Sequence, residues 1–299
     1  MSGTPLEFEE GHCPRCGIVP ARRVRTAESW LDGVPGSFSV RSCQRCGLWV
    51  TTPRPNRRSI GHTYPEGYHR VRLHQSTRPI PAATQGSVLD VGCGVGDALA
   101  VDRDNGWECL GIEVSEEAAD VARSRGLDVI TADAASDSYP DREFDRVRCW
   151  HTLEHVHDPL LLLTRLRAAV KPTGTISLIV PNRQSFTSTV FGRYWYHLDL
   201  PRHLHHFAPT DIHALTQATG LAIHQIRHTA APSGLLGSLD ILALQTLHRD
   251  PRLRSRNALR NAIRALTWAL AKLRLADVVE YTLVMRADHA DQVSLTGPD

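Results

Sequence analysis

The chain has 299 residues, a formal net charge of +2 and 41% hydrophobic residues. This length suits one full α/β domain with additions, and the hydrophobic share excludes a chain that is disordered throughout. The near-neutral charge excludes a protein that binds nucleic acid over its whole surface, so a local patch would have to carry such a role.

The N-terminus is acidic and lacks the apolar stretch that marks a secretory signal. No run of about 18 apolar residues occurs further along, so we expect no transmembrane helix. We therefore expect a cytoplasmic protein. In a reducing cytoplasm, closely paired cysteines indicate metal ligands before disulfides.

Two CxxC pairs lie within the first 50 residues, and a glycine follows each pair. Zinc prefers a tetrahedral set of ligands, and four thiolates fill that set, which is typical of a structural site. Residues 1–50 are therefore predicted to form a zinc ribbon with one structural Zn²⁺ held by Cys13, Cys16, Cys43 and Cys46. A catalytic zinc, which needs an open coordination position, and a redox dithiol pair are the alternatives.

Residues 51–85 are rich in proline, arginine, histidine and tyrosine, and we expect an ordered connector with a short helix. From residue 87 onward, apolar strand patterns alternate with helical ones. This alternation predicts an α/β fold with a Rossmann-like, doubly wound, mostly parallel sheet of seven strands. The predicted strands cover 87–92, 108–114, 127–133, 143–151, 174–182, 221–229 and 278–287, and the predicted helices cover 95–105, 115–126, 158–170, 209–220 and 235–275.

The sheet and its additions are expected to form one domain. Its core spans 86–230 and contains an irregular, histidine-rich insertion at 182–208, and residues 231–290 add a helical cover and the last strand. Two helix starts are marked by capping residues, Ser115 and Asp158, and Pro159 occupies the first turn of the second helix.

The motif VLDVGCGVG at 88–96 comprises the end of the first strand of this core and a glycine-rich loop at 92–96. Glycine lets such a turn close tightly and lets a ligand approach the backbone. Asp90 precedes the loop, where an acid can face a cationic amino acid ligand. Glu113 ends the second strand, where a carboxylate can accept both hydroxyls of a ribose. The NAD fingerprint GxGxxG is absent, because Asp97 stands at its last position.

Four motifs follow one another between residues 86 and 182: VLDVGCGVG, GIEVS, TADA and FDRVRCWHTLEHVHDP. As an ordered set they resemble the class I S-adenosylmethionine-dependent methyltransferases. The resemblance implies that Asp90, Gly92 and Gly94 line the methionine moiety, that Glu113 holds the ribose, and that Asp133 accepts from the adenine amino group. It also implies that the segment after the fourth strand lies beside the sulfonium. The expected cofactor-binding residues are Asp90, Gly92, Gly94, Glu113, Asp133, Ala134 and Trp150.

Two histidine-rich segments follow the fourth and fifth strands, at 151–157 and 195–207. Ligands of open α/β sheets sit beyond the carboxyl ends of the strands, so we expect both segments near the acceptor. Histidine takes up protons at neutral pH, which makes His203 the first candidate for a catalytic base and His151 the second. For each histidine, packing within a lid is an equal alternative. The residues expected to orient or enclose the acceptor are Trp195, Tyr196, Asp199 and Arg202. A metal site from His151, Glu154 and His155 is a further alternative.

The segment WYHLDLPRHLHHF resembles a PRHLxHF signature found in a bacterial branch of these methyltransferases. That branch often occurs with polysaccharide and natural-product pathways. Its members commonly carry an N-terminal cysteine module followed by a CGLxxxxPRP segment, which here reads CGLWVTTPRP. The resemblance extends over nearly the whole chain but names no acceptor.

The predicted helix at 255–275 places leucine and isoleucine on one stripe and several arginines and lysines around it. Such a helix can cover the sheet or a second subunit of a homodimer. The alternative is an interfacial helix that makes a peripheral contact with anionic lipid.

The sequence thus predicts a methyltransferase that uses S-adenosylmethionine and acts on a small molecule, glycan or natural-product intermediate. O-methylation with a histidine base is the first expectation. Two alternatives remain, a zinc-ribbon methyltransferase of ribosomal RNA and a non-catalytic zinc-ribbon interaction protein. Nucleic acid is the less favoured partner, because the overall charge is nearly balanced.

Overall fold

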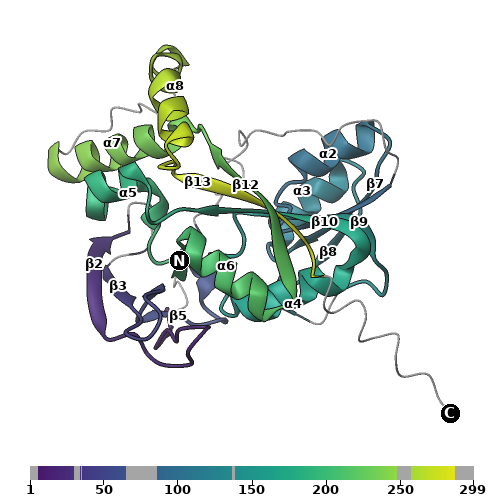
Figure 1. The fold of residues 1–299 in the computed structure, drawn as a ribbon, viewed down its shortest axis with the longest axis horizontal. Coiled ribbons are helices and arrows are strands. Elements are labelled where there is room, and N and C mark those ends of the chain that lie inside the picture. The colour runs from purple at the N-terminus through teal and green to yellow at the C-terminus, as the bar shows by residue number, and fades with distance from the viewer. Residues whose placement is uncertain are drawn as a thin grey trace. The chain divides into compact units, whose positions relative to one another are not determined.

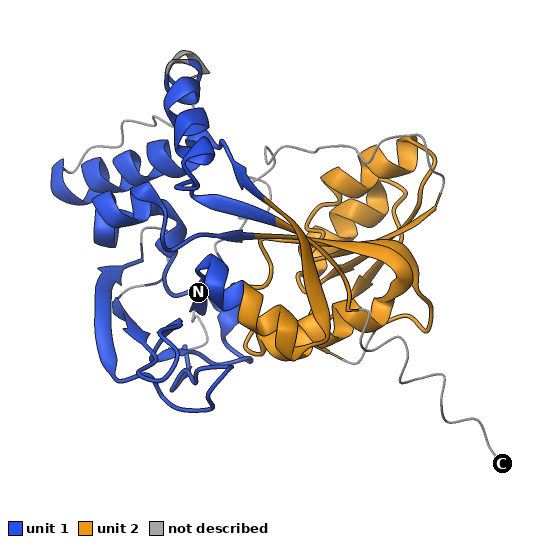
Figure 2. Cartoon of the chain, viewed as in Figure 1, with its two compact units in different colours: residues 1–65, 180–212, 227–280 blue, residues 66–179, 213–226, 281–299 orange. Residues whose placement is uncertain are grey.

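The computed structural model describes residues 6–29, 34, 36–64, 86–136, 139–247 and 257–286. The chain divides into two compact units (Figure 2). Unit 1 comprises residues 1–65, 180–212 and 227–280, and unit 2 comprises residues 66–179, 213–226 and 281–299. The predicted cysteine module and the segment 182–208 belong to unit 1, whereas the glycine-rich loop belongs to unit 2.

A seven-stranded sheet carries the fold (Figure 1). The pairs β9–β10, β6–β9, β6–β7 and β7–β8 are parallel. This arrangement confirms the predicted Rossmann-like, mostly parallel sheet of seven strands. In spatial order the strands are β12 (Leu221–Thr229), β13 (Val278–Met285), β10 (Val170–Pro181), β9 (Phe144–Trp150), β6 (Ser87–Val91), β7 (Glu108–Glu113) and β8 (Val129–Thr131).

Helices alternate with these strands as predicted: α2 (Asp97–Asp104), α3 (Glu116–Ser124), α4 (Pro159–Ala169) and α6 (Pro209–Ala218). The predicted caps are confirmed, since Ser115 Oγ accepts from the Ala118 backbone N–H and the Asp158 carboxylate accepts from that of Leu161. A hydrophobic cluster in unit 2 contains Val88, Leu99, Ala100, Trp107, Ala122 and Leu127. All of its members except Trp107 come from the predicted strands and helices, so local periodicity accounts for most of this part of the core.

Unit 1 contains more regular structure than the sequence suggests. A four-stranded sheet has the order β11 (His205–His206), β4 (Trp49–Thr51), β3 (Ser37–Ser42) and β2 (Arg22–Glu28), and β1 (Phe8–Glu9) pairs with β5 (Arg54–Pro55). A 3₁₀ turn, η1 (Ile60–Thr63), follows, and residues 65–85 of the predicted connector lie outside the described residues. The apolar cluster on the four-stranded sheet joins Ala27, Val34, Phe38 and Val40 to Trp195, Leu198 and Leu200. Local patterns miss it because three of these seven residues come from the segment 182–208.

That segment forms α5 (Phe186–Phe191), two 3₁₀ turns, η2 (Gly192–Tyr194) and η3 (Tyr196–Leu198), and strand β11. The region predicted to be helical, 235–275, contains two helices, α7 (Pro232–Leu247) and α8 (Asn257–Lys272), with residues 248–256 outside the described part. On α8, Leu270 is buried while Leu266 and Trp268 are exposed. Contact of this helix with lipid or a second subunit stays a prediction. None of the described helices combines the length and hydrophobicity needed to cross a membrane.

Candidate functional site

The glycine-rich loop between β6 and α2 has left-handed backbone at three glycines, with φ of +78° at Gly92, +57° at Gly94 and +79° at Gly96. A Cβ at Gly92 would lie 2.1 Å from Thr152 Oγ1, so the packing of the loop requires this glycine. A Cβ at Gly94 would meet no atom within 4 Å. The backbone at Gly94 is therefore open to close approach by a ligand, as the sequence predicts for a cofactor loop.

The carboxylate of Glu113 lies against this loop at the end of β7. One oxygen accepts from the Gly94 backbone N–H at 2.8 Å, and the other accepts from the Ser115 backbone N–H at 2.9 Å. Asp133 follows the neighbouring strand, β8, and its carboxylate accepts from the Ala135 backbone N–H at 2.8 Å. These bonds fix two carboxylates at the carboxyl ends of adjacent parallel strands, where open α/β sheets bind ligands.

Asp90, the third predicted acid, takes part in a buried ion-pair triad that sequence reasoning misses. Arg148 on β9 lies 2.9 Å from Asp90 and 2.7 Å from Asp102 of α2. All three residues are 4% exposed or less. Burial raises the pKa of the Asp90 carboxyl, and Arg148 opposes that rise. The sequence carries little signal for the triad, because strand FDRVRCW holds two arginines and an aspartate and does not show which arginine is buried.

The end of β9 holds the predicted Trp150 and His151. The Trp150 indole donates to Ser177 Oγ at 2.8 Å. His151 has a φ of +54°, which is uncommon for a residue with a side chain and is typical of constrained positions at functional sites. Its Nδ1 lies 3.3 Å from Glu154 Oε1. Among the described residues, the ligand atoms of His151, Glu154 and His155 do not all lie within 4.8 Å of one another, so the alternative metal site gains no support.

The residues predicted to contact the acceptor lie in unit 1 and have partners there. Asp199 Oδ1 accepts from both Nε and Nη2 of Arg202, at 3.0 and 2.6 Å. Arg202 also donates to the Thr63 carbonyl. The Trp195 indole donates to Asp277 at 3.0 Å, and the Tyr196 backbone N–H donates to Ser238 Oγ. These contacts fix the segment internally, and its contact with an acceptor stays a prediction.

His203 is buried in the same segment. Its Nδ1 lies 2.8 Å from the His197 carbonyl, and its Nε2 lies 3.6 Å from Asp199 Oδ2. A carbonyl oxygen can only accept, so Nδ1 carries a proton in this contact. When the ring is neutral, Nε2 therefore holds the lone pair, as a catalytic base requires.

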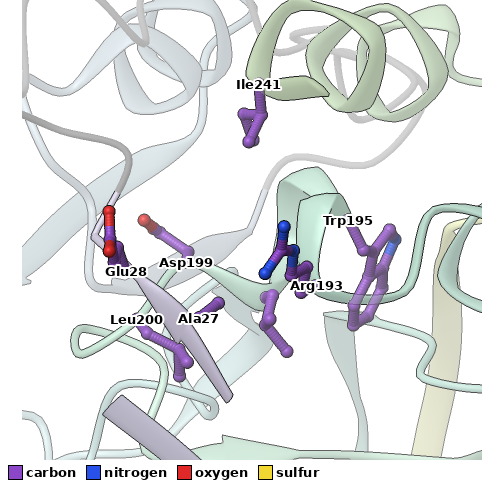
Figure 3. A pocket seen from close by; sticks show the side chains of 8 residues that line it. Ala27, Glu28, Arg193, Trp195, Asp199, Leu200 and Ile241 are labelled. Carbon is purple, nitrogen blue, oxygen red and sulfur yellow. The ribbon is translucent and has the colours of Figure 1, made fainter. Parts of the chain in front are cut away.

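A small pocket of about 10 Å³ is lined by Trp195, Leu198 and Asp199 together with Ala27, Glu28, Arg193, Leu200 and Ile241 (Figure 3). A volume of this size holds about one water molecule. Two of the four predicted acceptor-contacting residues thus share a cavity, but the cavity is too small for an acceptor.

Asp277 is a further buried acid that the sequence does not single out. Besides the Trp195 indole, it accepts from Ser185 Oγ at 2.8 Å and from Thr187 Oγ1. Burial raises the pKa of its carboxyl to about 6, although the hydrogen bonds from Trp195 and Ser185 oppose the rise. Its position just before β13 gives no local signal of this role, because its partners lie some 80–90 residues earlier in the chain.

The four N-terminal cysteines converge as predicted. All are free thiols, and their sulfurs lie within 4.8 Å of one another, with Cys13 and Cys46 3.4 Å apart. In each knuckle the glycine N–H donates to the carbonyl of the first cysteine at 2.8 Å. The left-handed φ of +69° at Gly17 and +77° at Gly47 explains the glycine after each pair. The donor set suits a tetrahedral zinc ion, for which a Zn–S distance of about 2.3 Å implies neighbouring sulfurs a little under 4 Å apart.

Comparison with known proteins places the glycine-rich loop in a known family. A family model described as a methyltransferase domain matches residues 61–226, which is more than half of the chain. Ubiquinone biosynthesis O-methyltransferase from Stutzerimonas stutzeri is 32% identical over 153 residues, which cover 46% of this chain and 66% of that protein. The protein of the same name from Methylococcus capsulatus is 35% identical over 130 residues, which cover 40% of this chain and 54% of that protein.

These matches therefore span less than two thirds of either relative. Among solved structures, a SAM-dependent methyltransferase from Archaeoglobus fulgidus is 22% identical, with a TM-score of 0.45 over 67% of this chain and 86% of that one. The family match covers the loop, Glu113, Asp133 and the end of β9 together. The chain belongs to the methyltransferase domain family.

Proposed function

We propose that this protein transfers the methyl group of S-adenosylmethionine to a hydroxyl group of a small molecule, glycan or natural-product intermediate. The observation that carries the proposal is the glycine-rich loop with its open position at Gly94, held by Glu113 at 2.8 Å, within the segment that matches the methyltransferase domain. The names of the relatives from Stutzerimonas stutzeri and Methylococcus capsulatus support an oxygen acceptor.

The residues present fit the cofactor. S-adenosylmethionine supplies a methyl group on a cationic sulfur, together with an ammonium group, two ribose hydroxyls and an adenine amino group. In this proposal Asp90, while paired with Arg148, faces the ammonium, Glu113 holds the ribose and Asp133 the adenine, and Gly92, Gly94, Ala134 and Trp150 provide the remaining contacts. Methyl transfer depends mainly on alignment of the donor and the acceptor, so a loop that positions the cofactor contributes to catalysis directly.

A hydroxyl acceptor must lose a proton, and we assign this role to His203, with His151 as the second candidate. The support is the hydrogen bond from His203 Nδ1 to the His197 carbonyl, which directs the basic lone pair to Nε2. Trp195, Tyr196, Asp199 and Arg202 would then shape the acceptor side. The likeness of this segment to the PRHLxHF signature supports an acceptor from a polysaccharide or natural-product pathway.

The cysteine cluster is proposed to hold one structural Zn²⁺ through Cys13, Cys16, Cys43 and Cys46. Four thiolates leave no open coordination position, so the ion would stabilise the module and take no part in methyl transfer. The support is the convergence of the four sulfurs within 4.8 Å.

The proposed function is tested by supplying radiolabelled S-adenosylmethionine and the purified protein to a host extract, which is then separated into RNA, lipid and small-molecule or glycan fractions. We expect label in the small-molecule or glycan fraction, including lipid-linked glycan. Glu113→Ala should abolish it, because the variant loses the carboxylate that is expected to hold the ribose. His203→Ala should lower label transfer by a factor of 10² or more while the affinity for S-adenosylmethionine stays unchanged, since general-base catalysis contributes roughly 10²–10⁴-fold.

The other outcomes separate the alternatives. Label that ribonuclease removes would move the acceptor to RNA. Label transfer by His203→Ala at the wild-type rate would rule out His203 as the base. No label in any fraction, from a protein that also fails to bind S-adenosylmethionine, would favour the non-catalytic interaction protein.

A further inference from the structure

Two arginines of unit 1 lie over the same tryptophan. The guanidinium carbon of Arg25, on β2, lies 4.9 Å from the centroid of the Trp49 ring, and that of Arg183, just after β10, lies 5.1 Å from it. Contact with an aromatic face holds a guanidinium in place through cation–π attraction and leaves its N–H groups at the edge available. All three residues are partly buried.

The charges of this cluster are not balanced. Arg183 is paired with Asp211, to which Nη2 donates at 3.0 Å and Nε at 3.2 Å. Arg25 donates only to uncharged oxygens, Ser188 Oγ at 3.0 Å and the Ser188 carbonyl at 2.7 Å, and it forms no ion pair with any carboxylate among the described residues. A partly buried cation without a counter-charge is disfavoured, so such an arrangement points to an anion that is supplied from outside.

The pKa values of Arg25 and His206 are lowered by this excess of positive charge, in addition to burial. Burial, followed by the charge of Arg183, lowers the pKa of Arg25 to about 10. Burial, together with the charges of Arg25 and Arg183, lowers the pKa of His206 to about 3. His206 is therefore neutral near pH 7, and its Nε2–H donates to Thr51 Oγ1 at 3.1 Å, because the Thr51 hydroxyl donates its own proton to the His203 carbonyl. Asp199 opposes the fall in the pKa of His206, but no carboxylate of the described residues pairs with Arg25 itself, and a bound anion would supply that partner.

The remaining donors define the class of anion. Each guanidinium has five N–H groups, of which Arg25 uses two and Arg183 uses two in the contacts above. The others suit a group with several acceptor oxygens, and arginine pairs bind phosphate through parallel hydrogen bonds. We propose that Arg25 and Arg183, held by Trp49, form an oxyanion site that takes a phosphate group. On the proposed function, a phosphorylated or diphosphate-linked acceptor would supply this group, but the site itself does not depend on methyl transfer.

The proposal is tested by titrating the full-length protein with pyrophosphate and with inorganic phosphate in isothermal calorimetry at constant ionic strength. We expect saturable binding to the wild type and at least a tenfold weaker affinity for pyrophosphate in Arg25→Gln, because a charge-assisted hydrogen bond is lost. Arg25→Lys keeps the charge without the planar fork and should fall between the two. The matched control is Arg22→Gln, which removes the same charge from an exposed position on the same strand and should change the affinity less than twofold.

Near-UV circular dichroism checks that each variant keeps the wild-type fold. Equal affinities of Arg25→Gln and Arg22→Gln for pyrophosphate would overturn the site, and so would a wild-type protein that binds neither anion. Acetate that binds more tightly than phosphate would overturn the assignment of the ligand as a phosphate group. Label transfer that persists in a protein without anion binding would refute this site while leaving the proposed function intact.

Discussion

Replacing Cys43 by serine is expected to release one zinc ion per chain and to unfold the N-terminal module. Serine offers no thiolate, so the remaining three sulfurs cannot close the tetrahedral set. Apparent binding free energies of structural zinc sites are about 10–16 kcal/mol in small zinc-finger peptides, and this energy is also folding energy. The two knuckles have little other structure to hold them, because residues 13–17 and 43–47 lie outside the strands.

The change is measured as zinc content by atomic emission after purification, together with protease sensitivity of the first 60 or so residues. The control is Cys109→Ser, which alters a thiol of unit 2 that donates to the Leu99 and Trp107 carbonyls, as a hydroxyl also can. This control should keep its zinc. A wild-type protein that carries no metal and forms two disulfides would contradict the zinc assignment.

Replacing Arg148 by methionine is expected to cost about 3–5 kcal/mol of unfolding free energy, the usual effect of leaving a buried charge without its partner. Arg148 is the link between Asp90 and Asp102, and both carboxylates are buried with it. Methionine fills similar space but removes the positive charge. Since small domains are stable by about 5–15 kcal/mol, the loss should be plain in urea denaturation.

The loss should also depend on pH. Burial already raises the pKa of the Asp90 carboxyl, and removing Arg148 raises it further. A carboxyl with a raised pKa in the folded state holds a proton that the unfolded chain has released, so stability falls as pH rises through that pKa. The free energy of unfolding that Arg148→Met loses relative to the wild type should therefore be smaller at pH 5 than at pH 8.

Arg146→Met is the matched control, because it removes an arginine from the same strand whose guanidinium lies over Trp107 and pairs with no acid in the described structure. Its cost should stay near or below about 1 kcal/mol. Equal losses in the two variants would contradict a special role for the triad, and so would a deficit of Arg148→Met that is independent of pH.

Much of the fold could be predicted because its signals are local. Strand and helix patterns alternate along the chain, and the caps at Ser115 and Asp158 mark helix starts directly. The cysteine cluster could be predicted equally well, since CxxC spacing and the following glycine specify the knuckle without knowledge of its surroundings. The glycine-rich loop was identified for the same reason.

The remaining features depend on contacts between distant residues. Strand β9 contains both Arg146 and Arg148, and nothing in the sequence says that Arg148 meets Asp102, because that depends on which face of α2 packs against the sheet. The sheet of unit 1 requires β11, some 155 residues after β4, to supply its edge. Asp199 and Arg202 are suited to bind an acceptor by chemistry, whereas the structure pairs them with each other. Periodicity and motif spacing carry no information on such partnerships.

The most direct test of the central claim is the binding of S-adenosylmethionine, measured by isothermal calorimetry. We predict one molecule bound per chain and a loss of roughly 100-fold or more in Glu113→Ala, since two charge-assisted hydrogen bonds contribute about 1.5–3 kcal/mol each. Glu116→Ala, which removes an exposed carboxylate from the first turn of α3, should bind as the wild type does. Binding with equal affinity in all three proteins would contradict the assignment of Glu113, and a folded wild-type protein that does not bind S-adenosylmethionine would contradict the proposed function as a whole.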